Sequence, residues 1–142
     1  MLKPIAFWDA SALVPLFVVQ SSTRQAFTFE SKYRIAVWWA THVEIVSALS
    51  QLLRLKGITP DEFAHAKVQA EGLANLWDVI VPTASVALGA RILLERYPLR
   101  AADALQLAAG LAWCEGKPSG KVFLTFDRRL SEAAAQVGFT LE

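Results

Sequence analysis

The stretch VFLTFDRRL at residues 122–130 gives the clearest indication of the fold, because a β-rich apolar run ends at an acidic residue and a helical pattern follows. Three other places in the chain share this arrangement. Asp9 follows the run IAFW, Glu44 lies just past the run IAVWW, and Asp103 opens the apolar stretch ALQL. In an open α/β sheet, the strand ends that lead into helices share one edge, and ligands bind there. The sequence therefore predicts that Asp9, Glu44, Asp103 and Asp127 meet in a site for a hard divalent cation.

Apolar β-rich runs alternate with helical patterns along the chain, which predicts a mainly parallel sheet covered by helices on both faces. The length of 142 residues suits one domain, residues 1–142. The expected strands span residues 3–8, 34–40, 77–81 and 121–126, with a further edge strand at 139–141. The expected helices span residues 10–19, 22–32, 41–56, 59–76, 83–97, 100–115 and 128–137.

Two helix starts carry the pattern of a capping box, in which side chains satisfy the first free backbone N–H groups. Thr41 and Glu44 form one such pair, and Thr59 and Glu62 form the other. Gly57 is expected to end the first of these helices in the C′ position. Every one of the four acids also has an ordinary explanation, because helix N-caps and first turns favour acidic residues. The same helix ends favour the charged form of a carboxylate, so the four acids are expected to stay ionised at neutral pH.

Composition excludes several classes of function. The chain has one cysteine and two histidines, so disulfides within the chain and zinc sites built on cysteine pairs are excluded. It has no P-loop and no glycine-rich dinucleotide motif. No apolar stretch reaches the roughly 18 residues that cross a membrane, and no signal peptide is expected, so we expect a cytoplasmic protein. The chain is 54% hydrophobic with a mean hydropathy of +0.35, which indicates apolar surface reserved for a partner.

Four motifs, read in order, resemble the PIN-domain nucleases, and among them the VapC-type toxins. They are FWDASAL at 7–13, VEIVSAL at 43–49, LRAADALQLA at 99–108 and FLTFDRRL at 123–130. The resemblance implies a PIN-like three-layer α/β/α sandwich with a central, mainly parallel sheet of four to five strands. It also implies an endoribonuclease that uses Mg²⁺ or Mn²⁺ to hydrolyse RNA phosphodiester bonds and acts as the toxin of a type II toxin–antitoxin system. A homodimer is implied, as is a small antitoxin whose C-terminal segment covers the active site.

By the same resemblance, Asp9 and Asp103 are the principal metal ligands, and Glu44 and Asp127 complete the acidic cluster. Gln106 stands where many relatives carry histidine. Setting the four acids aside leaves nine acidic residues against 14 lysines and arginines, and a basic body around an acidic site suits a polyanionic substrate.

Four further side chains are candidates for contact with substrate or with the acids. Hydroxyl groups of Ser11 and Thr125 are expected to donate to carboxylates or phosphate. Arg100 and Arg128 flank two of the acids and are expected to grip backbone phosphates. Whether one metal ion or two take part stays open, as do two alternatives: a non-catalytic interaction module on the same fold, and a metal-dependent phosphohydrolase acting on another substrate.

Overall fold

A parallel β-sheet forms the centre of the computed structural model, which describes residues 2–142. Its neighbouring strands follow the order β3-β2-β1-β4, and each pairs in parallel with the next. The strands are β1 Ile5–Trp8, β2 Arg34–Trp38, β3 Asp78–Ile80 and β4 Phe123–Leu124. The predicted α/β class and parallel sheet are confirmed.

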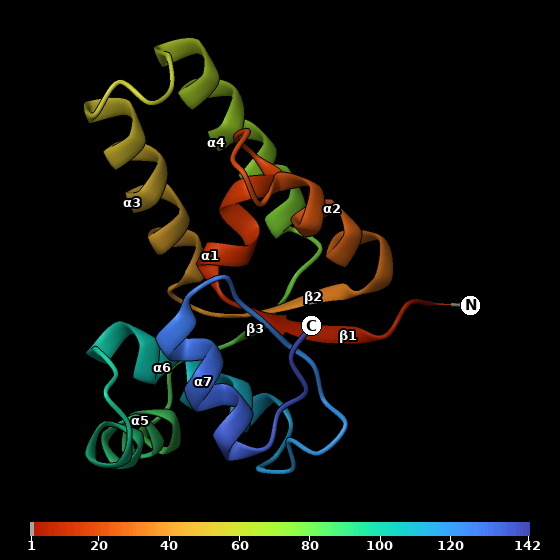
Figure 1. Ribbon diagram of the computed structural model, residues 1–142, viewed down its shortest axis with the longest axis vertical. Coiled ribbons are helices and arrows are strands. Elements are labelled where there is room, and N and C mark those ends of the chain that lie inside the picture. The colour runs from red at the N-terminus through yellow and green to blue at the C-terminus, as the bar shows by residue number, and fades with distance from the viewer. Residues whose placement is uncertain (1) are drawn as a thin grey trace.

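Helices cover both faces of this sheet, so the molecule has three layers (Figure 1). The first face carries α1 Ala10–Leu13, the 3-10 helix η1 Val14–Leu16, α2 Thr23–Lys32, α3 Thr41–Arg54 and α4 Pro60–Ala74. The second face carries α5 Ala84–Arg96, α6 Ala101–Trp113 and α7 Arg128–Val137. The predicted α/β/α sandwich is therefore present.

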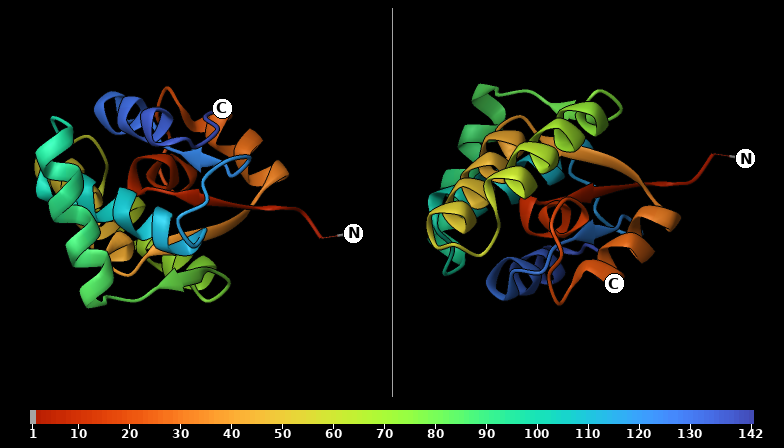
Figure 2. Two further views of the ribbon diagram at one scale, coloured as in Figure 1. Left: turned by 90° about the horizontal axis from the view of Figure 1, so that it is seen from below. Right: turned by 90° about the horizontal axis from the view of Figure 1, so that it is seen from above.

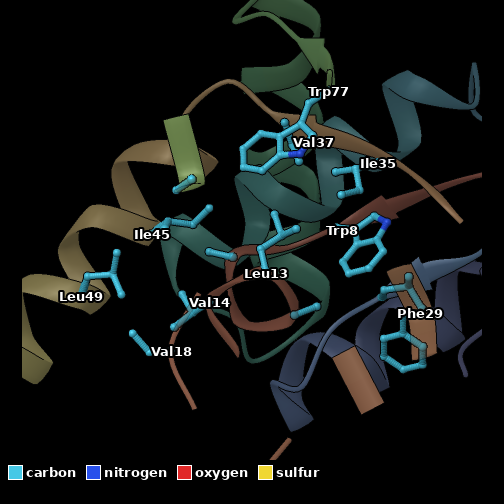
Figure 3. Packing of buried hydrophobic residues seen from close by; sticks show 14 of the residues in the cluster. Trp8, Leu13, Val14, Val18, Phe29, Ile35, Val37, Ile45, Leu49 and Trp77 are labelled. Atoms are coloured by element: carbon cyan, nitrogen blue, oxygen red, sulfur yellow. The ribbon is translucent and has the colours of Figure 1, made fainter. Parts of the chain in front are cut away.

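Alternate residues of β1, β2 and β4 belong to two separate cores, as the two-residue repeat of a strand requires. On the first face, Trp8 of β1 and Val37 of β2 pack with Ile45 of α3 (Figure 3). On the second face, Phe7 and Phe123 pack with the small residues of α6. Both faces of β1, β2 and β4 are buried, which explains why these runs are almost continuously apolar, whereas the edge strand β3 is largely exposed.

The order of the strands determines where a site can form. The chain moves outward from β1 through β2 to β3, and then returns to place β4 on the other side of β1. The order of the strands along the chain changes direction at β1, between β2 on one side and β4 on the other. In open α/β sheets ligands bind at such a position, outside the carboxyl ends of the strands. The Asp9 N–H donates to Leu124 O at 3.0 Å, so the ends of these two strands are held together.

Close packing of α6 depends on its small residues. An added Cβ at Gly110 would lie 3.0 Å from a ring carbon of Phe123 and 3.3 Å from one of Phe7. The helix can therefore approach the sheet only because Gly110 lacks a side chain. Gly89 of α5 faces Ala108 of α6, where an added Cβ would make an ordinary contact at 3.5 Å, and the two helices run side by side in Figure 2.

Some local predictions were wrong. The helix expected at 10–19 ends at Leu13 and continues as η1, because Pro15 cannot donate a backbone hydrogen bond. The expected strand at 139–141 is only a bridge between Val122 and Thr140. The left-handed residue that ends α3 is Lys56, with φ of 59°, rather than Gly57. The capping box at Thr59 and Glu62 is confirmed.

The capping box predicted at Thr41 and Glu44 is also wrong. The N-cap of α3 is Ala40, which has no side-chain cap, so the helix begins one residue earlier than the box requires. Both side chains of the predicted box contact Gln106 of α6 instead. A tertiary contact has therefore replaced the local one. Within residues 2–142, no helix has the length and apolar character needed to cross a membrane.

Candidate active site

The four acidic residues line one open pocket of about 470 Å³. Asp9 follows β1, Glu44 lies in the first turns of α3, Asp103 lies in the first turn of α6, and Asp127 is the N-cap of α7 after β4. The pocket therefore lies at the edge of the sheet where the strands lead into helices, as the sequence predicts. Its other lining residues are Ala10, Ser11, Val14, Gln20, Ser22, Ala48, Gln106 and Phe126.

Asp9 is held more firmly than the other acids. Its side chain is 4% exposed, and its Oδ1 accepts hydrogen bonds from the backbone N–H groups of Ser11 and Ala12 and from the Ser11 hydroxyl. Its Oδ2 accepts a hydrogen bond from the Thr125 hydroxyl at 2.6 Å. Asp9 is thus an N-cap and a pocket residue at once, so the structural and functional explanations both apply to it.

The two hydroxyl groups connect Asp9 to the segment after β4. Ser11 Oγ accepts a hydrogen bond from the Phe126 N–H at 2.8 Å, and Thr125 Oγ1 accepts one from the Asp127 N–H at 3.0 Å. Each hydroxyl therefore donates to Asp9 and accepts from the backbone that leads to Asp127. The predicted contacts of Ser11 and Thr125 with a carboxylate are present, and they fix the relative position of the two acids.

Asp127 and Asp103 occupy helix starts. Asp127 caps α7, because its Oδ1 accepts a hydrogen bond from the Leu130 N–H at 2.9 Å. Asp103 faces Asp127 closely enough for their charges to interact, and Arg100 and Arg129 partly offset that repulsion. The N-termini of α6 and α7 therefore both lie at the same pocket.

Glu44 is fixed by a residue that the sequence did not single out for this role. Gln106 lies on α6 with its side chain 1% exposed, and its Nε2 donates to Glu44 Oε1 at 3.1 Å and to Thr41 Oγ1 at 3.0 Å. The charge of Glu44 also interacts with those of Asp9 and Asp103. Glu44 is therefore electrostatically coupled to the acids that follow β1 and begin α6.

Burial raises the pKa of Asp9, Glu44 and Asp103, so the expectation that every acid is fully ionised at neutral pH is wrong for Glu44. Loss of water, together with the smaller effects of the charges of Asp9 and Asp103, raises the pKa of Glu44 to about 7, although the Gln106 hydrogen bond acts in the opposite direction. Burial also raises the pKa of Asp9 despite its four hydrogen bonds. Burial raises the pKa of Asp103, and the charge of Asp127 adds to this effect. A cation in the pocket would stabilise the charged carboxylates against both the loss of water and their mutual repulsion, and would therefore lower these pKa values.

The oxygen donors of the pocket have the chemistry that a hard divalent cation requires. Within residues 2–142, no three His, Cys, Asp or Glu side chains form a group that could hold a metal ion by themselves. Mg²⁺, however, keeps several waters and commonly uses one or two carboxylates together with substrate phosphate. Asp9 Oδ2 accepts a single hydrogen bond from the described residues, so it retains a lone pair for such an ion.

The arginines differ from the prediction in their placement. Arg128 is 92% exposed and pairs with Glu132, with 3.1 Å between Nε and Oε1, and neither Arg128 nor Arg100 lines the pocket. The charges that act on Asp103 come from Arg100 and Arg129. The sequence also did not identify Gln20 and Ser22, which line the pocket from the segment before α2.

Comparison with known proteins identifies relatives of this chain. No family model matches the chain. The ribonuclease VapC45 of Mycobacterium tuberculosis (strain CDC 1551 / Oshkosh) is 32% identical over 139 residues, which cover 95% of this chain and 92% of that protein. The crystal structure of VapC20 from Mycobacterium tuberculosis, a sarcin-ricin loop cleaving toxin, matches with a TM-score of 0.66 at 20% identity. That match covers 95% of this chain and 96% of the other.

A second solved structure, a toxin–antitoxin complex from Klebsiella pneumoniae, matches with a TM-score of 0.65 at 16% identity and covers 89% of this chain and 90% of that one. At these identities the solved structures establish the fold, whereas the curated relative establishes the family. The four acids lie within motifs that span residues 7–130, and the match to the curated relative covers 95% of the chain. The chain belongs to the VapC family of PIN-domain ribonucleases.

Proposed function

We propose that the protein is a Mg²⁺- or Mn²⁺-dependent endoribonuclease that acts as the toxin of a type II toxin–antitoxin system. The observation that carries this proposal is the single pocket lined by Asp9, Glu44, Asp103 and Asp127. The names of two similar proteins support it, because one is a ribonuclease and the other is a sarcin-ricin loop cleaving toxin.

Asp9 and Asp103 would hold the metal ion, and Glu44 and Asp127 would complete its surroundings directly or through water. When bound, such an ion polarises a phosphoryl group and lowers the pKa of bound water. Asp9 is suited to its role because Ser11 and Thr125 fix both of its oxygens before any ligand arrives. This preorganisation removes the cost of arranging the carboxylate during the reaction.

Glu44 would accept the proton of the attacking water. In the metal-free pocket burial raises its pKa to about 7, and a bound cation would lower that value, so at neutral pH Glu44 would be ionised and able to accept a proton. The Gln106 amide occupies Oε1, so Oε2 is the atom that would take the proton. Arg100 and Arg129 would contact the RNA backbone beside Asp103, and Arg128 would do so after leaving Glu132.

Two kinds of protein partner form part of the proposal. A small antitoxin whose C-terminal segment covers the acidic pocket is supported by the similarity to a chain of a toxin–antitoxin complex. A hollow of about 540 Å³ between α2 and α4, with Phe27 and Leu76 on its wall, offers apolar surface for such a partner. A homodimer is supported by the edge strand β3 and by Leu88 and Ile92 of α5, which are 49% and 44% exposed.

The test is cleavage of total RNA by the purified protein with Mg²⁺, with Mn²⁺ and with EDTA. Asp9→Asn and Asp103→Asn should abolish cleavage, and Asp78→Asn, an exposed position at the start of β3, should leave it intact. Cleavage that persists in EDTA or in the first two variants would refute the proposal. Failure of the wild type to cleave RNA, combined with tight partner binding by all variants, would favour a non-catalytic interaction module. Cleavage of DNA or small phosphoesters alone would favour another phosphohydrolase.

A further inference from the structure

Gln106 lies one turn after Asp103 on α6 and connects that helix to α3. Its side chain is 1% exposed, so its amide group is shielded from water. Its Nε2 donates to Thr41 Oγ1 at 3.0 Å and to Glu44 Oε1 at 3.1 Å, across a sequence separation of 62 residues for the second bond. One amide nitrogen therefore uses both of its hydrogens to join the N-terminal turns of two helices that each contribute an acid to the pocket.

The other end of the same amide is left without a partner. Gln106 Oε1 is buried and accepts no hydrogen bond from the described residues. An unpartnered buried acceptor costs free energy, about 1–3 kcal/mol in typical cases. The favourable contribution of the amide therefore lies in its NH₂ group, which donates to Thr41 and Glu44.

The orientation of the amide is determined by Glu44. An ionised Glu44 carboxylate, which is the form that a bound cation favours, can only accept hydrogen bonds, so the NH₂ group faces it and the carbonyl takes the unpartnered side. Thr41 is fully buried at the first position of α3 and holds the second hydrogen of the NH₂ group. The pair of bonds thus fixes both where the Glu44 carboxylate lies and which of its oxygens is occupied.

We infer that Gln106 is a positioning residue that fixes the Glu44 carboxylate relative to Asp103 in the acidic pocket. The inference rests on the proposed function, because it concerns how that site is held ready. Gln106 acts through Glu44 and has no role of its own toward RNA. Its removal should therefore lower turnover and metal affinity while leaving the fold and RNA binding largely unchanged.

The experiment compares the full-length wild type with Gln106→Met, which keeps the length of the side chain but cannot donate. Gln51→Met makes the same change at an exposed position of α3 and serves as the matched control. At saturating Mg²⁺ and RNA, Gln106→Met should lower kcat about 10- to 100-fold, the usual effect of losing a partner that orients a metal-site group. KM for RNA should stay within about twofold, and Mn²⁺ affinity without RNA, measured by calorimetry, should fall about 10-fold. The Tm should stay within about 4 °C.

A double-mutant cycle with Glu44→Ala shows whether Gln106 acts through Glu44. In that background, Gln106→Met should change kcat and Mn²⁺ affinity by less than about twofold. An equal loss in both backgrounds, or an unchanged kcat in the single variant, would overturn the inference. Gln106→Glu replaces the donor by a second carboxylate, and it should lose at least as much activity. If neither variant folds, the amide is structural and the inference is overturned.

The wild type distinguishes this inference from the proposed function. A wild type without metal-dependent cleavage would overturn both. An active wild type accompanied by a fully active Gln106→Met would overturn the inference alone.

Discussion

Glu44→Gln should stabilise the metal-free protein, and the gain should grow with pH. The ordinary pKa of a glutamate is 4.5, and burial raises that of Glu44 to about 7. Between these values the native state binds more protons than the unfolded state, so the free energy of unfolding falls as pH rises. The loss begins near pH 4.5 and is complete above pH 7. Glutamine keeps an oxygen for the Gln106 amide but carries no charge, so the variant escapes this loss.

The size of the effect follows from the same values. A difference from 4.5 to about 7 corresponds to at most about 3.4 kcal/mol. Glu44 is only half-buried, so solvent screening reduces the expected gain to about 1–2 kcal/mol at pH 8. At pH 4 wild type and variant should differ by less than about 0.5 kcal/mol, because Glu44 is protonated in both states.

Urea denaturation in EDTA from pH 4 to pH 8.5 measures this difference directly. Glu95→Gln, at an exposed position of α5, controls for the loss of one negative charge. The argument that burial dominates at Glu44 would be refuted by a stability difference that does not vary with pH. It would also be refuted if the stability of the wild type rose relative to that of the variant as pH increases.

Four further predictions concern packing, preorganisation, metal binding and assembly. Gly110→Ala should destabilise the protein by about 1–3 kcal/mol through overpacking. Gly72→Ala adds a Cβ with nothing within 4 Å, and it should stabilise the protein by about 0.5–1 kcal/mol. A urea midpoint that is higher for Gly110→Ala than for Gly72→Ala would contradict this prediction. Thr125→Val removes a donor to Asp9 and should lower kcat about 10- to 100-fold, so an unchanged rate would count against the role of the hydroxyl. Mg²⁺ at 100 times its Kd should raise the free energy of unfolding by about 2.7 kcal/mol, and the Asp9→Asn variant should show far less of this gain at the same concentration. Ile92→Arg should convert the proposed dimer to monomer in light scattering, and a wild type that is already monomeric would exclude that dimer.

The sequence was sufficient to predict the edge of the sheet that carries the pocket. Strand runs such as 5–8 and 122–126 are recognisable because both of their faces are buried, and each of these runs leads directly to an acid. In a parallel sheet this order alone brings Asp9 and Asp127 to one edge. The positions of these two residues follow from local patterns, because each is also the N-cap of its helix.

Contacts between distant helices were not predictable in the same way. The spacing of Thr41 and Glu44 fits a capping box, but only the packing of α6 against α3 shows that Gln106 takes both side chains. The pKa of Glu44 depends on how much water reaches it, which no sequence pattern records. Gln20 and Ser22 lie in the turn before α2, and only the folded chain brings that turn to the pocket.

The partnership of β1 with β4 has a consequence for how the protein is made. The hydrogen bond from Thr125 to Asp9 spans 116 residues, so β1, the first strand to be synthesised, can pair with β4 only after most of the chain has been made. Contacts of such long range form late in folding, because the chain between the two residues must first lose conformational entropy. Nascent chains that stop before β4 lack Thr125 and Asp127, and therefore cannot form the acidic pocket. The acidic pocket can therefore be complete only after translation has passed Asp127, near the end of the 142-residue sequence.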